Sequence, residues 1–167
     1  MKVLFIGNSY TYFNELWTLF KETAKCGGYQ VETDQVTPGG WFLEWHADSK
    51  SEYGKIVDEL LKNNRYDVVF LQEQSVRPAK EPALFYQAVK VLYQKIKNSN
   101  PDARIILYQT WGRRKDEDCV LKENSWTNEE MTVLLKNAYL TVATQLGIEV
   151  SPVGSAFFAL HNGEEYP

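Results

Sequence analysis

Short apolar runs alternate along this chain with longer segments in which apolar residues recur every three or four positions. Short runs of this kind are typical of buried strands, and the longer period is typical of helices with one apolar face. We predict strands at 3–6, 68–71, 104–108 and 148–150 from such runs, and a strand at 29–36 from the alternation of its residues.

The segments between these strands carry start signals for helices. Ser49 is followed by Glu52, and Thr127 by Glu130, which is the spacing of a capping box at a helix N-terminus. We therefore predict a helix that begins at each of these pairs.

Two further helices follow from apolar spacing and from helix-breaking residues. One comes after the first strand and ends at Gly27-Gly28, because glycine commonly stops a helix. The other has Pro82 in its first turn, a position that accepts proline, and runs to Asn98. The polar stretch 112–124 is predicted to be a surface loop.

The alternation of strands and helices predicts a parallel sheet covered on both faces. With right-handed crossovers the fold class is α/β, a three-layer α/β/α sandwich around a five-stranded parallel sheet. We find no internal repeat and no boundary, so 1–167 is predicted to be a single domain. Ligands of such sheets bind at the carboxyl ends of the strands, which directs attention to the segments after them.

Composition agrees with a globular domain and excludes several classes of function. The 167 residues are 44% hydrophobic and 24% charged. Lys and Arg total 18 and Asp and Glu total 22, and the net charge of −4 disfavours binding to nucleic acid. The basic run 113–115 is followed directly by the acidic run 116–118, so it forms no basic patch. No apolar run approaches the roughly 18 residues of a membrane span.

Cysteine and histidine are scarce and scattered. Cys26 and Cys119 are isolated, and the two histidines are His46 and His161. Because they form no ligand motif, we predict no metal site, no cofactor and two reduced cysteines. The N-terminal apolar run is too short for a signal peptide, which favours a cytoplasmic location. The sequence does not determine the oligomeric state.

Ser9 follows the first predicted strand, within Gly7-Asn8-Ser9-Tyr10-Thr11. There it would stand at a sharp strand-to-helix turn, near backbone N–H groups that favour an oxyanion formed by attack on a carbonyl. The alternative is that Ser9 only caps the helix.

Gly40 and Gln74 follow the second and third predicted strands. Gly40 could direct a backbone N–H into the same crevice, although it also suits an ordinary loop turn. Gln74 offers a side-chain amide, although glutamine is equally at home in a surface loop. With Ser9 they supply the donors of an oxyanion hole, and their origin at three successive strand ends is more specific than any one of them.

The segment at Ser9 resembles the first sequence block of the SGNH hydrolases, also called GDSL-type esterases and lipases, with Asn8 in place of the usual Asp. Gly39-Gly40 resembles the glycine block of that family. Residues 71–75 lie where the family has Gly-x-Asn-Asp, but without its Gly and its final Asp. The resemblance covers nearly the whole chain. It implies a flavodoxin-like SGNH hydrolase fold with Ser9 as nucleophile and the three donors as its oxyanion hole.

A serine nucleophile needs a base, which in this family comes from an Asp-x-x-His block after the fifth strand. Position 158 is Phe158 where that Asp would precede His161, and no such block occurs before Pro167. We therefore expect the domain to be truncated at its C-terminus. His46 is a second candidate base because it follows the glycine pair, but it also suits packing against Trp45.

The sequence thus predicts a serine esterase that cleaves a carboxylic ester of a small molecule or carbohydrate, with this 167-residue form impaired. Trp41, Phe42, Trp45 and Trp111 fall in or near strand-end loops. They could stack on the sugar of an O-acetyl ester, although ordinary packing would also explain them. The alternatives are a degenerate esterase without its base and a non-catalytic α/β binding domain. The binding domain is disfavoured because the chain lacks both GxGxxG and a P-loop.

Overall fold

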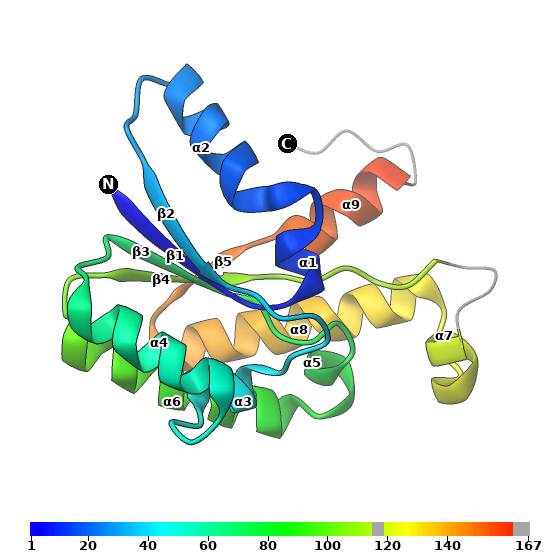
Figure 1. The fold of residues 1–167 in the computed structure, drawn as a ribbon. Helices are drawn as coiled ribbons and strands as arrows, with labels where there is room; N and C mark the ends of the chain where they lie inside the picture. The colour runs from blue at the N-terminus through cyan, green and yellow to red at the C-terminus, as the bar shows by residue number, and fades with distance from the viewer. Residues whose placement is uncertain (115–118, 162–167) are drawn as a thin grey trace.

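A computed structural model of the chain describes residues 1–114 and 119–161 and contains a five-stranded parallel sheet (Figure 1). The strands lie in the order β2-β1-β3-β4-β5. In chain order they are β1 (Lys2–Ile6), β2 (Glu32–Val36), β3 (Val68–Leu71), β4 (Arg104–Tyr108) and β5 (Glu149–Ser151). The predicted α/β/α sandwich is confirmed, with helices on both faces of the sheet.

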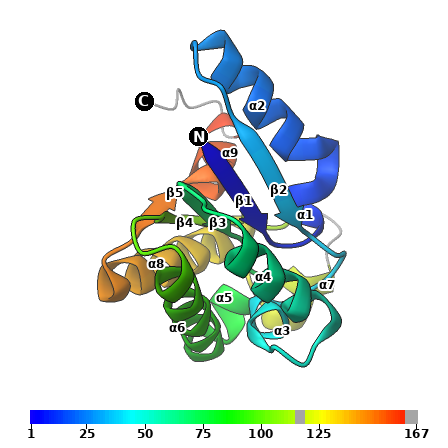
Figure 2. The ribbon, with the colours of Figure 1, turned by 60° about the vertical axis from the view of Figure 1, so that its left-hand side comes forward.

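Two groups of helices cover the sheet. Helices α2 and α9 lie on one face, and α3, α4, α5, α6 and α8 lie on the other (Figures 1 and 2). The helices are α1 (Ser9–Tyr12), the 3₁₀ helix η1 (Phe13–Glu15), α2 (Leu16–Cys26), α3 (Leu43–Ala47), α4 (Glu52–Asn63), α5 (Arg77–Lys80), α6 (Pro82–Ser99), α7 (Cys119–Asn124), α8 (Asn128–Leu146) and α9 (Val153–His161).

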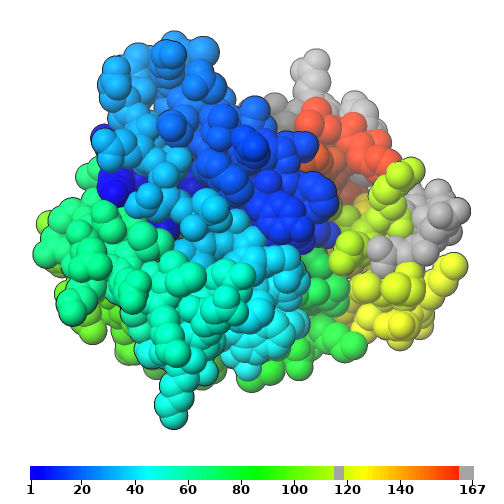
Figure 3. Space-filling model, in the orientation of Figure 1, coloured from blue at the N-terminus to red at the C-terminus, as the bar shows by residue number. Residues whose placement is uncertain are grey.

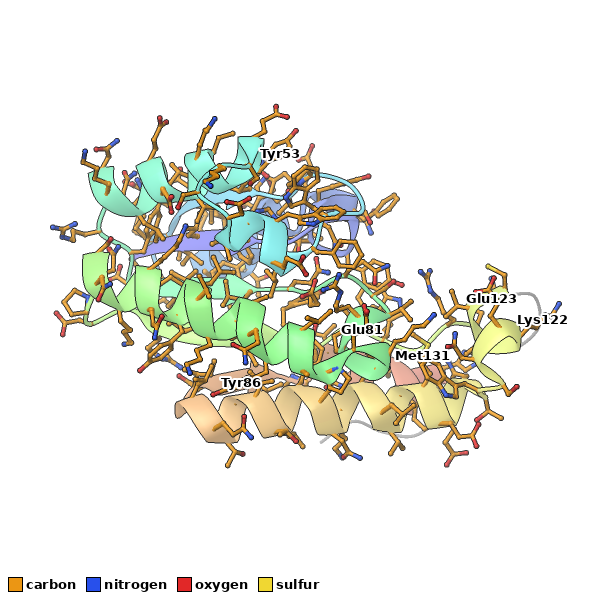
Figure 4. The ribbon with its side chains drawn as sticks, turned by 90° about the horizontal axis from the view of Figure 1, so that it is seen from below. Tyr53, Glu81, Tyr86, Lys122, Glu123 and Met131 are labelled. Atoms are coloured by element: carbon orange, nitrogen blue, oxygen red, sulfur yellow. The ribbon has the colours of Figure 1, made fainter. Side chains whose placement is uncertain are left out.

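The larger core lies between the sheet and α3, α4, α6 and α8. Leu4 of β1 and Val69 of β3 are neighbours in register, and both belong to one buried cluster with Tyr139 of α8. Seen from below, α6 with Tyr86 and α8 with Met131 run side by side in this layer (Figure 4). These long helices bury most of one sheet face.

The smaller core lies under α2. Phe5 of β1 and Phe70 of β3 are paired in register, and their rings stack with centroids 5.0 Å apart. Phe20 of α2 packs edge-on against both rings, at 5.7 and 5.8 Å. Because the central strands bury side chains on both faces, their sequences are continuous apolar runs rather than alternating ones.

One predicted capping box is confirmed and the other is wrong. Thr127 caps α8: the Glu130 N–H donates to Thr127 Oγ1 at 3.1 Å, and the Thr127 N–H donates to Glu130 Oε2 at 2.7 Å. Helix α4, however, is capped by Ser51 and not by Ser49. The Ser51 hydroxyl accepts from the Gly54 N–H at 2.9 Å and donates to a carbonyl of α3, which ties the start of the helix to its neighbour.

Two other boundaries differ from the prediction. The polar stretch 112–124 contains helix α7, while 115–118 lie outside the described residues. Leu121 is the buried residue of α7, and one apolar contact in a short helix leaves little periodic signal. The second strand begins at Glu32 rather than near Tyr29, whose side chain is exposed.

Candidate active site

The chain reverses its direction of winding at the pair β1 and β3. From β1 it passes to β2 at one edge, and then returns to add β3, β4 and β5 on the other side. In open α/β sheets such a switch point forms the ligand crevice at the carboxyl ends of the strands. Ser9 follows β1, and residues 72–75 follow β3, so both segments lie at this point.

Ser9 is the first residue of α1 and is half-buried. The cap of α1 is Asn8, whose Oδ1 accepts from the Tyr10 N–H at 3.1 Å, so the alternative role of Ser9 as the cap is wrong. Within the described residues, neither the hydroxyl nor the backbone N–H of Ser9 forms a hydrogen bond. Both groups are therefore available to a ligand.

The turn at Ser9 is held by Gln72, which is buried at the end of β3. Gln72 Oε1 accepts from the Asn8 N–H and from Thr11 Oγ1, both at 2.9 Å, and Gln72 Nε2 donates to Asn8 Oδ1 at 3.0 Å. A Cβ at Gly7 would lie 2.7 Å from both Gln72 Oε1 and Thr11 Oγ1, so glycine is needed there for close approach. Sequence reasoning missed Gln72, although a polar residue directly after an apolar strand is the available signal.

Gly40 lies in the loop between β2 and α3, and its φ of +70° favours glycine. Asn8 Nδ2 donates to the Trp41 carbonyl at 2.8 Å, which joins this loop to the turn at Ser9. On the face shown in Figure 3, the blue surface of α1 and α2 borders the cyan surface of the segment after β2. The Gly40 N–H donates to no group in the part of the chain that the structure describes.

Gln74 lies in the loop after β3 and is half-buried. Its Oε1 accepts from the Val76 N–H at 2.8 Å and from the Arg77 N–H at 3.1 Å, at the start of α5. These two bonds determine which end of the amide is the oxygen. The Nε2 group is left with no acceptor among the described residues. Gln74 thus presents an oriented amide donor.

Glu73 connects the loops of Gly40 and Gln74. Its Oε1 accepts from the Leu43 N–H at 3.0 Å and from the Gln74 N–H at 2.7 Å. With the bonds of Asn8, these contacts bring together the three strand-end segments that the sequence singled out. Sequence reasoning gave no role to Glu73.

No family model and no curated protein match this chain. Several solved structures, however, are similar to it. A candidate SGNH hydrolase of Slackia heliotrinireducens shares 26% identity and a TM-score of 0.82, over 95% of this chain and 82% of its own. The resemblance of the chain to the SGNH-type family is therefore supported by solved structures.

Two further solved structures share the fold of this SGNH-type chain. A DUF4886 family protein of Bacteroides uniformis has a TM-score of 0.79 at 19% identity, covering 95% of this chain and 69% of that one. A candidate GDSL-like lipase of Parabacteroides merdae has a TM-score of 0.68 at 13% identity, covering 96% of this chain and 81% of that one. These structures confirm the fold that the family resemblance implies, while the roles of Ser9, Gly40 and Gln74 stay predictions.

His46 of the SGNH-type chain is fully buried in α3. Its Nε2 lies 2.9 Å from the Gly7 carbonyl oxygen, so Nε2 carries the proton and donates. Burial lowers the pKa of His46 to about 4, against the opposing effect of that bond. Its Nδ1 is also buried, with no partner among the described residues. The ring packs near Trp41, with centroids 6.4 Å apart, and this geometry favours a structural role over that of a base.

His161 is the last residue of α9 and is exposed. The polar tail 162–167, where the sequence suggests the approach to the family's final block, lies outside the described residues. Within the described residues, the SGNH-type chain therefore offers Ser9 no evident histidine base.

The four aromatic residues that the sequence places in or near strand-end loops divide into two groups. Trp41 and Phe42 each pack edge-on against Trp45, with ring centroids 5.0 and 4.6 Å apart. Trp111 instead stacks in parallel on Tyr10, with centroids 4.2 Å apart and an interplanar angle of 4°. Tyr10 of this second group directly follows Ser9 in sequence.

An apolar pocket of about 860 Å³ adjoins this second group. Its walls come from the sheet, from α2 and from α9, and include Phe20 and Phe157. Tyr10 and Trp111 line the same pocket, so it extends to the residue that follows Ser9.

Residues 1–114 and 119–161 show neither a metal site nor a membrane-spanning helix. In this range no three His, Cys, Asp or Glu side chains gather as a possible metal site. None of the helices described is both long and apolar enough to cross a membrane. Cys26 and Cys119 are exposed, free thiols.

Proposed function

We propose that this chain is a serine ester hydrolase with Ser9 as its nucleophile. One observation carries the proposal: three connected segments each present an N–H donor without an acceptor among the described residues. The donors are the backbone of Ser9, the backbone of Gly40 and the side chain of Gln74. The SGNH and GDSL-type structures that share the fold support a general role in ester hydrolysis.

In this proposal Ser9 Oγ attacks the carbonyl carbon of the ester, and a carbon–oxygen bond forms while the π electrons move to the carbonyl oxygen. The three N–H donors stabilise the resulting oxyanion. As the intermediate collapses, the bond to the alcohol oxygen breaks and the alcohol leaves with the proton that the Ser9 hydroxyl gave up. Water then attacks the acyl-serine and releases the carboxylic acid.

The two histidines of the chain are not placed to serve as the general base of this reaction. His46 donates to the Gly7 carbonyl, and His161 is exposed at the end of α9, so neither is placed as a base. A general base contributes about 10²–10⁴-fold in rate. Without such a base, we expect turnover to be lower by about that factor.

For the substrate we propose an acetyl ester on a carbohydrate. The parallel pair Tyr10 and Trp111 beside Ser9 supports this proposal, because aromatic faces pack well against the apolar face of a sugar ring. Hydrolysis of acetylated monosaccharides compared with ethyl acetate tests this choice. Equal catalytic efficiency on the two would contradict a carbohydrate substrate.

The nucleophile is tested by hydrolysis of p-nitrophenyl acetate. Ser9→Ala should abolish turnover, whereas Ser49→Ala, which alters an exposed loop serine, should leave it unchanged. Turnover that survives Ser9→Ala would contradict the assignment. Absence of any Ser9-dependent turnover would instead favour the degenerate esterase or the binding domain. A thermal-shift screen with nucleotides and sugars would distinguish these two alternatives.

A further inference from the structure

Glu73 is a fully buried residue between the two loops that carry proposed oxyanion donors. Its Oε1 accepts from the N–H groups of Leu43 and Gln74, and Leu43 lies three residues after Gly40. We propose that Glu73 is a positioning residue that sets the placement of Gly40 relative to Gln74. This inference rests on the ester hydrolase proposed above.

The Gly40 loop has few other attachments at this end. Leu43 begins α3, and the N-cap Phe42 supplies no side-chain hydrogen bond, so Glu73 takes the place of a cap from across the site. At the other end of the same short segment, Asn8 Nδ2 holds the Trp41 carbonyl. The segment that follows Gly40 is therefore joined to the nucleophile turn by Asn8 and to the Gln74 loop by Glu73. Arg77 of α5 also lies over the Phe42 ring, at 4.1 Å from its centroid, and pairs with Glu44.

Packing alone does not account for a glutamate here. Burial raises the pKa of Glu73 to about 7, against the opposing effects of the bonds from Leu43 and Gln74 and of the Arg77 charge. Its Oε2 is buried and has no hydrogen-bond partner among the described residues. An apolar side chain would fill the space without that desolvation cost. A carboxyl group is explained by its Oε1, which accepts hydrogen bonds from both loops. Because the group is buried, it does not contact substrate.

Two variants distinguish the hydrogen-bonding role of Glu73 from the effect of its side-chain volume. Glu73→Gln keeps an acceptor oxygen, whereas Glu73→Met keeps similar length without one. We expect Glu73→Gln to retain kcat on p-nitrophenyl acetate within about threefold, and Glu73→Met to lower it about 100-fold with KM little changed, as for loss of an oxyanion donor.

Asn100 provides the matched control for general destabilisation. It is buried near the amino ends of the strands, and its Oδ1 accepts from the Tyr66 N–H at 2.8 Å. Asn100→Leu should lower the melting temperature but leave kcat unchanged. Full kcat in Glu73→Met, or equal losses of kcat in both Glu73 variants, would overturn the positioning role.

Amide hydrogen exchange tests the bridge without any turnover. The Leu43 and Gln74 amides should exchange faster in Glu73→Met than in the native chain, and should stay protected in Glu73→Gln. Unchanged exchange in Glu73→Met would mean that the positioning inference has failed. Hydrolysis that does not depend on Ser9 would mean instead that the proposed function has failed, whatever the exchange pattern.

Discussion

Gln72 and Asn8 form a reciprocal pair across the switch point of the sheet. Gln72 Oε1 accepts from the Asn8 N–H at 2.9 Å, and Gln72 Nε2 donates to Asn8 Oδ1 at 3.0 Å. The same Asn8 oxygen caps α1, where Ser9 begins the helix. The position of the proposed nucleophile is thus determined by a side chain from another strand.

Gln72→Leu should destabilise the chain and disorder the turn at Ser9. The substitution leaves the buried N–H of Asn8 without its acceptor, at a cost of about 1–3 kcal/mol. Urea unfolding measures the loss, and Gln94→Leu on an exposed position of α6 is the control. A Gln72→Leu variant as stable as this control would contradict the role of the pair.

Gly7→Ala should also be destabilising, by about 1–3 kcal/mol. The added methyl group would lie 2.7 Å from Gln72 Oε1 and from Thr11 Oγ1, which are themselves hydrogen-bonded to each other. Gly39→Ala is the matched control, because its methyl group would meet Tyr12 at an ordinary 3.5 Å. Thermal unfolding of the two variants should therefore separate them clearly, and equal melting temperatures would show that the site relaxes freely.

His46 should make the free energy of unfolding rise with pH. Burial lowers the pKa of His46 from 6.5 to about 4, so between these values the unfolded chain binds a proton that the folded chain does not. Stability due to the neutral ring is complete above pH 6.5 and is lost as the pH falls to 4, by about 3 kcal/mol. His46→Gln keeps a donor for the Gly7 carbonyl. The unfolding free energy of the native chain minus that of His46→Gln should rise with pH across this window.

Glu73, in contrast to His46, should make the free energy of unfolding fall as the pH rises. Burial raises the pKa of Glu73 from 4.5 to about 7, so between these values the folded chain holds a proton that the unfolded chain has lost. Stability due to the protonated carboxyl is complete below pH 4.5 and is lost as the pH rises to 7, by about 3 kcal/mol. The unfolding free energy of the native chain minus that of Glu73→Gln should therefore fall with pH. A flat difference would mean that the carboxyl titrates normally.

Trp111→Ala should raise KM for an acetylated monosaccharide by about tenfold, because the stacked face beside Tyr10 is lost. The effect on ethyl acetate, which has no ring, should be small. Trp45→Ala alters the other aromatic group and serves as the control. Equal effects of Trp111→Ala on both esters would argue for a general change in the site.

The sequence by itself determined the order of the elements and the candidate nucleophile. Apolar runs located the central strands, because a strand buried on both faces must be apolar along its length, and alternation located β2 at the edge of the sheet. The capping box at Thr127 was readable because its two hydrogen bonds join residues three apart. Ser9 was found for the same reason, since its place directly after a strand is a local property.

Only the tertiary structure decided how the site is held together. Asn8 and Gln72 lie 64 residues apart, and Leu43 and Glu73 lie 30 apart, so no local spacing marks either pair. His46 looked like a loop histidine, but α3 buries it against the Gly7 carbonyl. The polarity of a side chain is visible in sequence, whereas the partner that makes its burial tolerable depends on strands brought together by folding.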